Sequence, residues 1–272
     1  MTNERQTKLR RLVDQWIEET EDWFRTDDIW RQYNVITSEG KQVVYQRLKE
    51  HKEAGRVEKQ GLRYRCVDKD LEEIDIFQDA KFVSIKFPFQ LEKYIRLSEG
   101  SILMIAGGSS SGKTAWCLNT ACLNMNDWEI HYFDSESGVA LLQERLFAIE
   151  PNLPNPLPFK LWDRMDNFAD VIKPGALNIV DYLDSDSEFY MVGAEIKKIL
   201  VALKGRGVAV IAMQKPPPVR GRDGKLIVRD LAYGGGVTIK KSQVYLSLDE
   251  NKLKIVKAKS RANPKVNPVN KT

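Results

Sequence analysis

The sequence predicts an α/β protein whose larger part is a mostly parallel sheet flanked by helices, preceded by a small α+β domain. From about residue 95 onward, short apolar runs alternate with helical patterns, which is typical of strand–helix–strand units. The first 67 residues instead show three helical patterns and then two short strands. A stretch rich in Asp and Glu follows them. The expected organisation is a first domain at 1–67, a linker at 68–94, a core at 95–262 and a flexible tail at 263–272.

The composition is that of an ordinary folded protein, with 42% hydrophobic and 29% charged residues in 272. The three cysteines and two histidines lack the spacing of a zinc site or a disulfide framework. No apolar stretch approaches the roughly 20 residues that span a bilayer. The charged N-terminus also lacks the apolar core of a signal peptide. We therefore expect a cytoplasmic protein without a membrane partner.

Charge is distributed unevenly along the chain. The net charge is +4, yet residues 215–272 carry 14 Lys or Arg and only 4 Asp or Glu. A basic end of this kind favours a polyanionic partner. The alternative is a solvated basic face followed by an unstructured tail.

In the first domain, apolar residues at helical spacing predict a helix from about Lys8 to Glu19. Thr26 is the expected N-cap of a short second helix, and Ser38 that of a third, which runs to about Ala54. Two short strands, 56–60 and 62–67, then form a hairpin about Gly61.

Three helices followed by a hairpin resemble the winged helix-turn-helix family. In that family the third helix enters the major groove and the hairpin contacts phosphates or the minor groove. The resemblance therefore assigns DNA contact to helix residues Lys41, Gln42, Tyr45, Gln46 and Lys49 and to hairpin residues Lys59, Arg63 and Arg65. Winged helices also dock proteins, and this domain is nearly neutral, with 14 basic and 12 acidic residues. Docking to a partner or to another copy is thus the alternative.

A nucleotide-binding P-loop pattern follows the apolar run 102–106. Its glycines let backbone N–H groups wrap the phosphates, its lysine reaches the β/γ oxygens, and its last hydroxyl faces Mg²⁺. A helix that begins near the end of the pattern points its positive end at the phosphates. The residues of this motif are Gly107, Gly108, Ser109, Ser110, Ser111, Gly112, Lys113 and Thr114. The alternative is a chance Gly/Ser turn, which the preceding strand and following helix argue against.

Three later strands end in polar residues suited to the same site. The run 130–133 leads into Asp134-Ser135-Glu136, and a carboxylate there can orient a water toward the γ-phosphate. The run 177–180 ends at Asp181, which with Thr114 is expected to hold hydrated Mg²⁺. The run 208–213 ends at Gln214, which can hydrogen-bond the γ-phosphate.

The segment 215–230 is a basic, proline-containing loop, and a disordered surface insertion is the alternative. Its cations are Arg220, Arg222, Lys225 and Arg229. Two further strands, 243–248 and 252–257, close the core.

Residues 95–262 resemble the RecA-like ATPases, the superfamily of bacterial strand-exchange recombinases and DnaB-type hexameric helicases. The landmarks are the P-loop, 134–136, Asp181, Gln214, 233–236 and 253–259. The resemblance implies that the nucleotide is ATP, that Glu136 activates water, and that Gln214 senses the nucleotide. It also implies a homo-oligomer, ring or filament, because two lysines of recombinases and an arginine of helicases reach the adjoining subunit's ATP. The corresponding residues are Lys257, Lys259 and Arg261. In the family the loop after the sensor residue faces DNA, so the resemblance implies DNA contact for the basic loop 215–230.

The expected function is an oligomeric DNA-dependent ATPase motor of replication or recombination, either a small ring helicase or a recombinase-like filament that holds single-stranded DNA at its core. One alternative is an ATP-controlled DNA-targeting or regulatory protein that does not separate strands. A small-molecule P-loop kinase is another.

Overall fold

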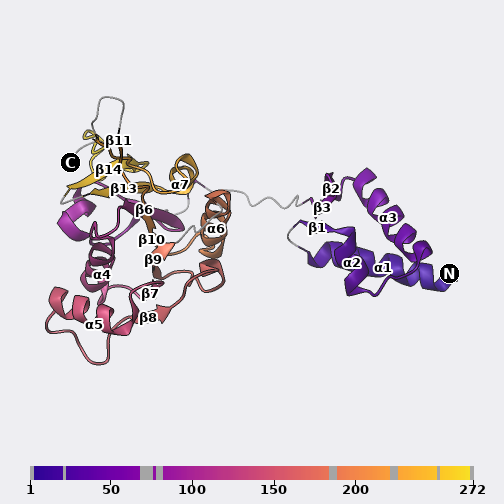
Figure 1. The fold of residues 1–272 in the computed structure, drawn as a ribbon, viewed down its shortest axis with the longest axis horizontal. Coiled ribbons are helices and arrows are strands. Elements are labelled where there is room, and N and C mark those ends of the chain that lie inside the picture. The colour runs from indigo at the N-terminus through magenta and orange to yellow at the C-terminus, as the bar shows by residue number, and fades with distance from the viewer. Residues whose placement is uncertain are drawn as a thin grey trace. The chain divides into compact units, whose positions relative to one another are not determined.

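The computed structural model describes residues 3–20, 23–67, 76–77, 82–183, 189–220, 226–249 and 252–269. The chain divides into two compact units between Ile76 and Phe77 (Figure 1). None of the described helices is long and apolar enough to cross a lipid bilayer.

The first unit holds three helices and a small antiparallel sheet of strand order β1-β3-β2. Its elements are α1 (Asn3–Glu19), β1 (Phe24–Arg25), α2 (Thr26–Gln32), α3 (Ser38–Glu53), β2 (Val57–Gln60) and β3 (Arg63–Cys66). The three helices and the hairpin about Gly61 lie where the sequence places them. Strand β1 was not expected, since two residues are too few to show a period.

Three helix boundaries differ from the expected ones. Helix α1 begins at Asn3 rather than Lys8, because its first turn is polar and adds nothing to the apolar period. Arg25, not Thr26, is the N-cap of α2. Thr37, not Ser38, caps α3, and its hydroxyl accepts a hydrogen bond from Gly40 N at 3.1 Å. Thr37 and Ser38 both carry a hydroxyl, so the sequence does not distinguish them as caps. The backbone conformation determines which of the two is the N-cap.

An ion cluster joins α1 to α3 beside the apolar core of the first unit. The Arg47 guanidinium forms a bidentate ion pair with Asp14: Nε donates to Oδ1 at 2.6 Å, and Nη2 donates to Oδ2 at 2.8 Å. The buried His51 places Nε2 2.7 Å from Asp14 Oδ1. Burial alone would raise the pKa of the Asp14 carboxyl, but these hydrogen bonds outweigh burial and hold that pKa below its ordinary value.

The second unit is built on a seven-stranded sheet of order β14-β13-β6-β10-β9-β7-β8. Only β14 is antiparallel to its neighbour. The strands are β6 (Ser101–Gly107), β7 (Ile130–Asp134), β8 (Lys160–Asp163), β9 (Leu177–Leu183), β10 (Val208–Gln214), β13 (Val244–Asp249) and β14 (Lys252–Ala258). This mostly parallel sheet, flanked by helices, confirms the predicted fold class.

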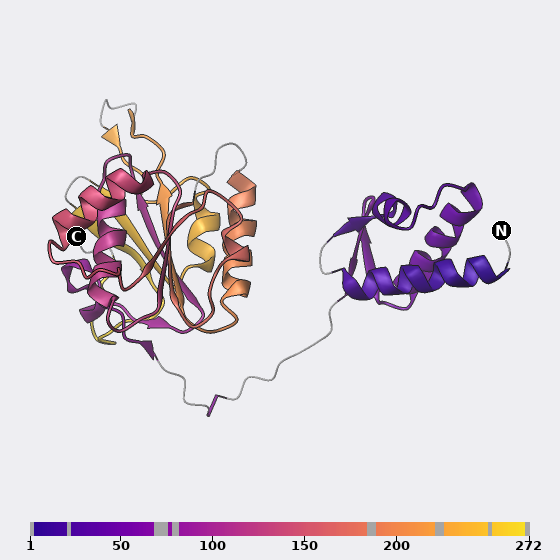
Figure 2. The same cartoon turned by 90° about the horizontal axis from the view of Figure 1, so that it is seen from below.

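Helices cover both faces of the sheet (Figures 1 and 2). Helices α4 (Lys113–Asn124) and α5 (Gly138–Ile149) pack on one face, while α6 (Phe189–Ala202) and α7 (Gly236–Lys241) pack on the other. Strand β6 contributes to both cores, because its side chains alternate: Leu103 and Ile105 face α4, and Ile102 and Met104 face α6. A strand that is buried on both faces has apolar side chains at successive positions, which explains the apolar run 102–106 in the sequence.

Two segments assigned to linker and tail belong to the core. Strand β4 (Phe82–Val83) pairs with β5 (Leu97–Ser98), and the 3-10 helix η1 (Pro88–Lys93) lies between them. Ile85, Phe87 and Leu91 are buried in the α4-side core, so the linker expected at 68–94 ends earlier. In the expected tail, Pro268 is buried and Val269 packs on the same core. Mixed composition hid these apolar contacts, which tertiary packing alone reveals.

Asp14→Asn should lower the free energy of unfolding of the first unit by about 1–3 kcal/mol at pH 7, because charge-assisted hydrogen bonds are lost. A carboxyl whose pKa is depressed by folding stabilises the protein above its unfolded pKa, about 3.9. That stabilisation disappears as the pH falls through the folded pKa. The difference in free energy of unfolding between the wild type and Asp14→Asn should therefore shrink near pH 3. Hydrogen-exchange protection of α1 and α3 measures it, with exposed Glu18→Gln as the control. A deficit independent of pH would contradict this account of the cluster.

Candidate nucleotide-binding site

The P-loop connects β6 to α4 and borders a cavity of about 600 Å³. Gly112 caps α4 with a left-handed φ of 92°, and Ser110 also has a positive φ of 59°. Alternating handedness of this kind turns successive backbone N–H groups toward one point. Because α4 begins at the cavity, the positive end of its dipole faces the same space.

Lys113 is buried, and its Nζ lies back over the loop that precedes it. It donates hydrogen bonds to the carbonyl oxygens of Gly107 at 3.2 Å and Gly108 at 2.7 Å. Burial lowers the pKa of the Lys113 ammonium, and the negative charge of Asp181 opposes that shift. A buried cation whose hydrogen bonds go to backbone carbonyl oxygens is suited to pairing with an anionic ligand.

The parallel register brings the ends of separate strands to this cavity. Gln214 lies beside Gly107 in the β10–β6 pair, and Asp134 lies beside Asp181 in the β7–β9 pair. Glu136 and Gln214 both line the cavity together with the P-loop. The structure thus gathers Lys113, Thr114, Glu136 and Gln214, although they span about a hundred residues of sequence.

Asp181 lies within β9 rather than at its tip, because the strand continues to Leu183. The carboxylate is buried, and Oδ2 accepts a hydrogen bond from the Tyr132 hydroxyl at 2.5 Å. Burial raises the pKa of Asp181, while the hydroxyls of Tyr132 and Thr114 lower it by hydrogen bonding. A carboxylate within reach of the Thr114 hydroxyl fits hydrated Mg²⁺, which takes one or two protein oxygens and completes its shell with phosphate and water.

Five lining residues were not assigned to the site from the sequence: Ala115, Ser137, Leu141, Arg145 and Tyr182. Tyr182 follows Asp181, and its ring centroid lies 6.0 Å from Lys113 Nζ. Leu141 and Arg145 come from α5. They are four residues apart and therefore share a helix face, so their spacing was the available signal.

The three residues expected to act on a neighbouring subunit lie away from this cavity. In the register of β14, Lys257 pairs with Tyr245, which pairs with Met104 near the middle of β6. Lys259 and Arg261 follow Lys257 and lie farther toward the end of the sheet at which β6 and the other parallel strands begin. Lys257 Nζ also donates to the carbonyls of Ile239 and, at 2.6 Å, Ser242, at the end of α7. Lys259 is exposed.

The basic segment 215–230 forms a two-stranded hairpin in its described part, β11 (Val219–Arg220) with β12 (Leu226–Ile227), and projects beyond the sheet (Figures 1 and 2). Arg220 and Arg229 are exposed on it, whereas Arg222 and Lys225 lie outside the described residues. At its root, the buried Lys215 binds Asp249 at 2.8 Å.

In the first unit, α3 and the β2–β3 hairpin border a cavity of about 300 Å³. It is lined by Gln42, Tyr45, Gln46, Lys49, Lys52, Lys59 and Tyr64. The structure therefore brings five of the predicted DNA-contacting residues together and adds Lys52 and Tyr64. Two others have local partners: Arg65 pairs with Glu58, and Lys41 Nζ lies 4.6 Å from the Trp30 ring centroid. Arg63 is exposed outside this cavity.

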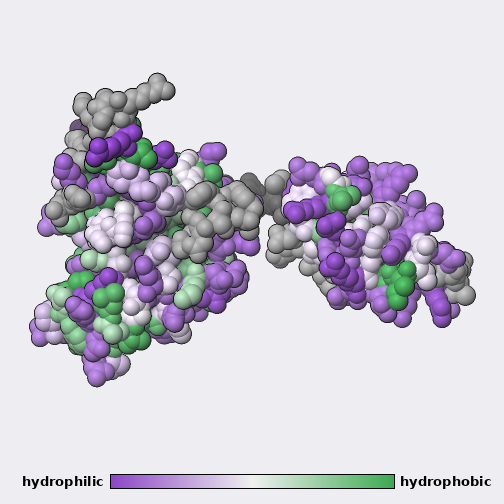
Figure 3. All heavy atoms as spheres, viewed as in Figure 1, coloured by the Kyte–Doolittle hydropathy of each residue, from purple (hydrophilic) through white to green (hydrophobic). Residues whose placement is uncertain are grey.

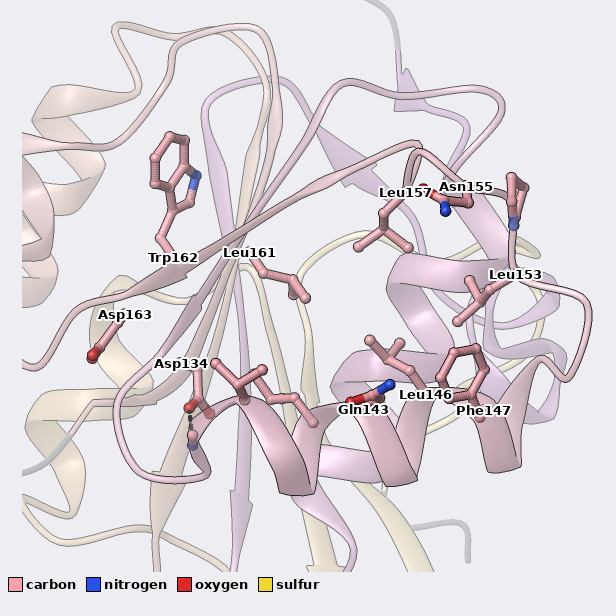
Figure 4. A pocket seen from close by; sticks show the side chains of 14 residues that line it. Asp134, Gln143, Leu146, Phe147, Leu153, Asn155, Leu157, Leu161, Trp162 and Asp163 are labelled. Carbon is pink, nitrogen blue, oxygen red and sulfur yellow. Dashed lines mark hydrogen bonds between the residues drawn. The ribbon is translucent and has the colours of Figure 1, made fainter.

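An apolar cavity of about 410 Å³ lies on the other side of α5. Leu146 and Phe147 of α5, Leu161 of β8 and the leucines of the 150–158 connection point into it (Figure 4). Hydrophobic residues also reach the surface there (Figure 3), with Phe147 50% exposed. The described residues that line it include no Lys or Arg, so of these two cavities the P-loop cavity is the better candidate for binding phosphate.

No family model matches the chain, and no curated protein matches it. The solved structures similar to it include a KaiC-like protein from the hyperthermophilic archaeon Pyrococcus horikoshii. That structure is 16% identical with a TM-score of 0.46, and the match covers 67% of this chain and 90% of the archaeal one.

Gly107→Ala should weaken triphosphate binding by a factor on the order of 10 to 100, because one or two charge-assisted hydrogen bonds are lost when the loop shifts. A Cβ at Gly107 would stand 2.2 Å from Ser111 Oγ and 3.1 Å from the Leu248 carbonyl. The adjacent Gly108→Ala is the matched control, since a Cβ there meets nothing within 4 Å. Calorimetric titration with a non-hydrolysable ATP analogue measures both variants. Equal losses would show that steric displacement of the loop is not the cause.

Proposed function

We propose that this protein is an oligomeric, DNA-dependent ATPase motor of DNA replication or recombination, acting as a small ring helicase or a recombinase-like filament. The observation that carries the ATPase part is the single cavity lined by the P-loop, Glu136 and Gln214. These groups supply what phosphoryl transfer to water needs: a phosphate cradle, a carboxylate beside the terminal phosphate and a polar group that contacts it.

Each residue has a separate task in this reaction. The P-loop amides and Lys113 bind the phosphate oxygens, and Lys113 exchanges its carbonyl partners for them. Thr114 and Asp181 would hold Mg²⁺, which neutralises charge on the β- and γ-oxygens. Glu136 orients the attacking water and takes its proton, for which its exposed carboxylate at the cavity wall is suitably placed.

Lys113→Ala should weaken nucleotide binding, whereas Glu136→Gln should retain binding and lose hydrolysis by a factor on the order of 100 or more. The glutamine keeps the size of the side chain but cannot accept the proton. Equilibrium titration and phosphate release measure the two quantities. Exposed Glu144→Gln, on α5 but outside the cavity lining, is the control. Unchanged hydrolysis in Glu136→Gln would remove Glu136 from the reaction.

The oligomeric part of the proposal concerns the residues at and beyond the end of β14. A cation that serves a neighbour's ATP has to lie away from its own P-loop, and Lys259 and Arg261 satisfy this condition. Lys257 is engaged with the carbonyls at the end of α7. We therefore propose that Lys259 and Arg261 act across the interface, and that Lys257 must release those carbonyls before it can do so.

The DNA part of the proposal concerns two basic surfaces. The β11–β12 hairpin follows Gln214 directly and carries exposed arginines, so it suits single-stranded DNA near the motor. The α3–hairpin cavity holds three lysines beside polar side chains, so it suits the phosphate backbone of a duplex. A regulatory protein without motor activity would show weak stimulation of hydrolysis by DNA and no strand separation.

Removing charge from one surface should weaken one kind of DNA selectively. Arg220→Ala with Arg229→Ala should flatten the salt dependence for single strands by about 0.7 in log–log slope per lost phosphate contact. Lys49→Ala with Lys59→Ala should do the same for duplex, by about 0.9 per contact. Each double variant is the control for the other. If the arginine variant keeps the wild-type salt dependence for single strands, the β11–β12 hairpin does not bind DNA. If the lysine variant keeps it for duplex, the α3–hairpin cavity does not.

A further inference from the structure

The P-loop cavity has a second cation that the motif does not supply. Among the described residues that line it, only Lys113 and Arg145 carry positive charge, and they come from different walls. Lys113 begins α4, while Arg145 lies in the second turn of α5. A nucleoside triphosphate with its metal ion spreads negative charge over several oxygens, and one lysine contacts only some of them.

The position of Arg145 is determined by the two faces of α5. Leu142 and Leu146 are buried in the sheet core and anchor the helix. Leu141 and Arg145, four residues apart, therefore share the face toward the cavity. Arg145 is half-buried, which removes part of its water shell without hiding its guanidinium.

Arg145 is anchored beside the residue expected to activate water. Its Nη1 donates a hydrogen bond to Ser137 Oγ at 3.1 Å, and Ser137 directly follows Glu136. This one bond uses one of the five N–H donors of the guanidinium. The remaining donors form a planar fork whose geometry matches two oxygens of a phosphate.

We propose that Arg145 binds the terminal phosphate of the nucleoside triphosphate within its own subunit. Its link to Ser137 holds it at the Glu136 end of the cavity, where the terminal phosphate must lie if Glu136 orients the attacking water. The inference rests on the proposed nucleotide binding. It adds to that proposal a cation supplied in cis, distinct from those expected from a neighbouring subunit.

The test compares a non-hydrolysable ATP analogue with ADP by calorimetric titration in the presence of Mg²⁺. Arg145→Ala should weaken binding of the analogue about tenfold to hundredfold, the range of a charge-assisted hydrogen bond. Its affinity for ADP should stay within about threefold of the wild type, because ADP lacks the contacted phosphate. The affinity of Arg145→Lys for the analogue should lie between those of the wild type and Arg145→Ala, since lysine keeps the charge but lacks the planar set of donors. Ser137→Ala should also weaken binding of the analogue more than binding of ADP, but by a smaller factor than Arg145→Ala does.

Arg206→Ala is the matched control, because Arg206 is exposed and is not part of the cavity lining. Equal losses for the analogue and ADP in Arg145→Ala would overturn the assignment to the terminal phosphate. Unchanged binding of both in Arg145→Ala would overturn the contact altogether. Wild-type protein that binds neither nucleotide would overturn the proposed function as well, so the two failures are distinguishable.

Discussion

The parallel pairing of β6, β10, β9 and β7 places the carboxyl ends of four strands at one edge of the sheet, and the candidate site depends on this. Both faces of the sheet are covered by helices, so the strand ends are where polar groups can gather around a ligand. The register sets Gly107 beside Gln214 and Asp134 beside Asp181. A one-residue slip would turn these side chains to the opposite face of the sheet.

The same edge connects the nucleotide cavity to the basic hairpin through backbone contacts. The amide of Lys215 donates to the Gly107 carbonyl at 2.9 Å, and the amide of Tyr233 donates to the Gln214 carbonyl at 3.0 Å. Lys215 is also held by Asp249. Gln214 therefore lies between the P-loop and both ends of the segment that carries the hairpin. If Gln214 contacts the terminal phosphate as we propose, its movement when that phosphate is lost would be transmitted to that segment through these hydrogen bonds.

Patterns that depend on neighbouring residues were readable from the sequence. The P-loop, the apolar strands and the amphipathic helices each repeat within a few residues, and the fold class followed from their order. Short or irregular elements gave no such signal, which is why strand β1 and the core contribution of Ile85, Phe87 and Leu91 were missed. Arg145 was missed for another reason: its helical spacing was visible, but the face toward the cavity is fixed only when Leu142 and Leu146 pack on the sheet.

The sequence by itself determined the chemistry available to this protein: a phosphate-binding loop, acidic and amide groups at strand ends, and a basic C-terminal part. Tertiary structure decided which of these groups meet. It brought Glu136 and Gln214 to the P-loop, buried Asp181 against Tyr132, and placed Lys259 and Arg261 away from the cavity. The physical reason is that strand order and register are set by long-range hydrogen bonds and by packing on both faces, which local residue patterns do not specify.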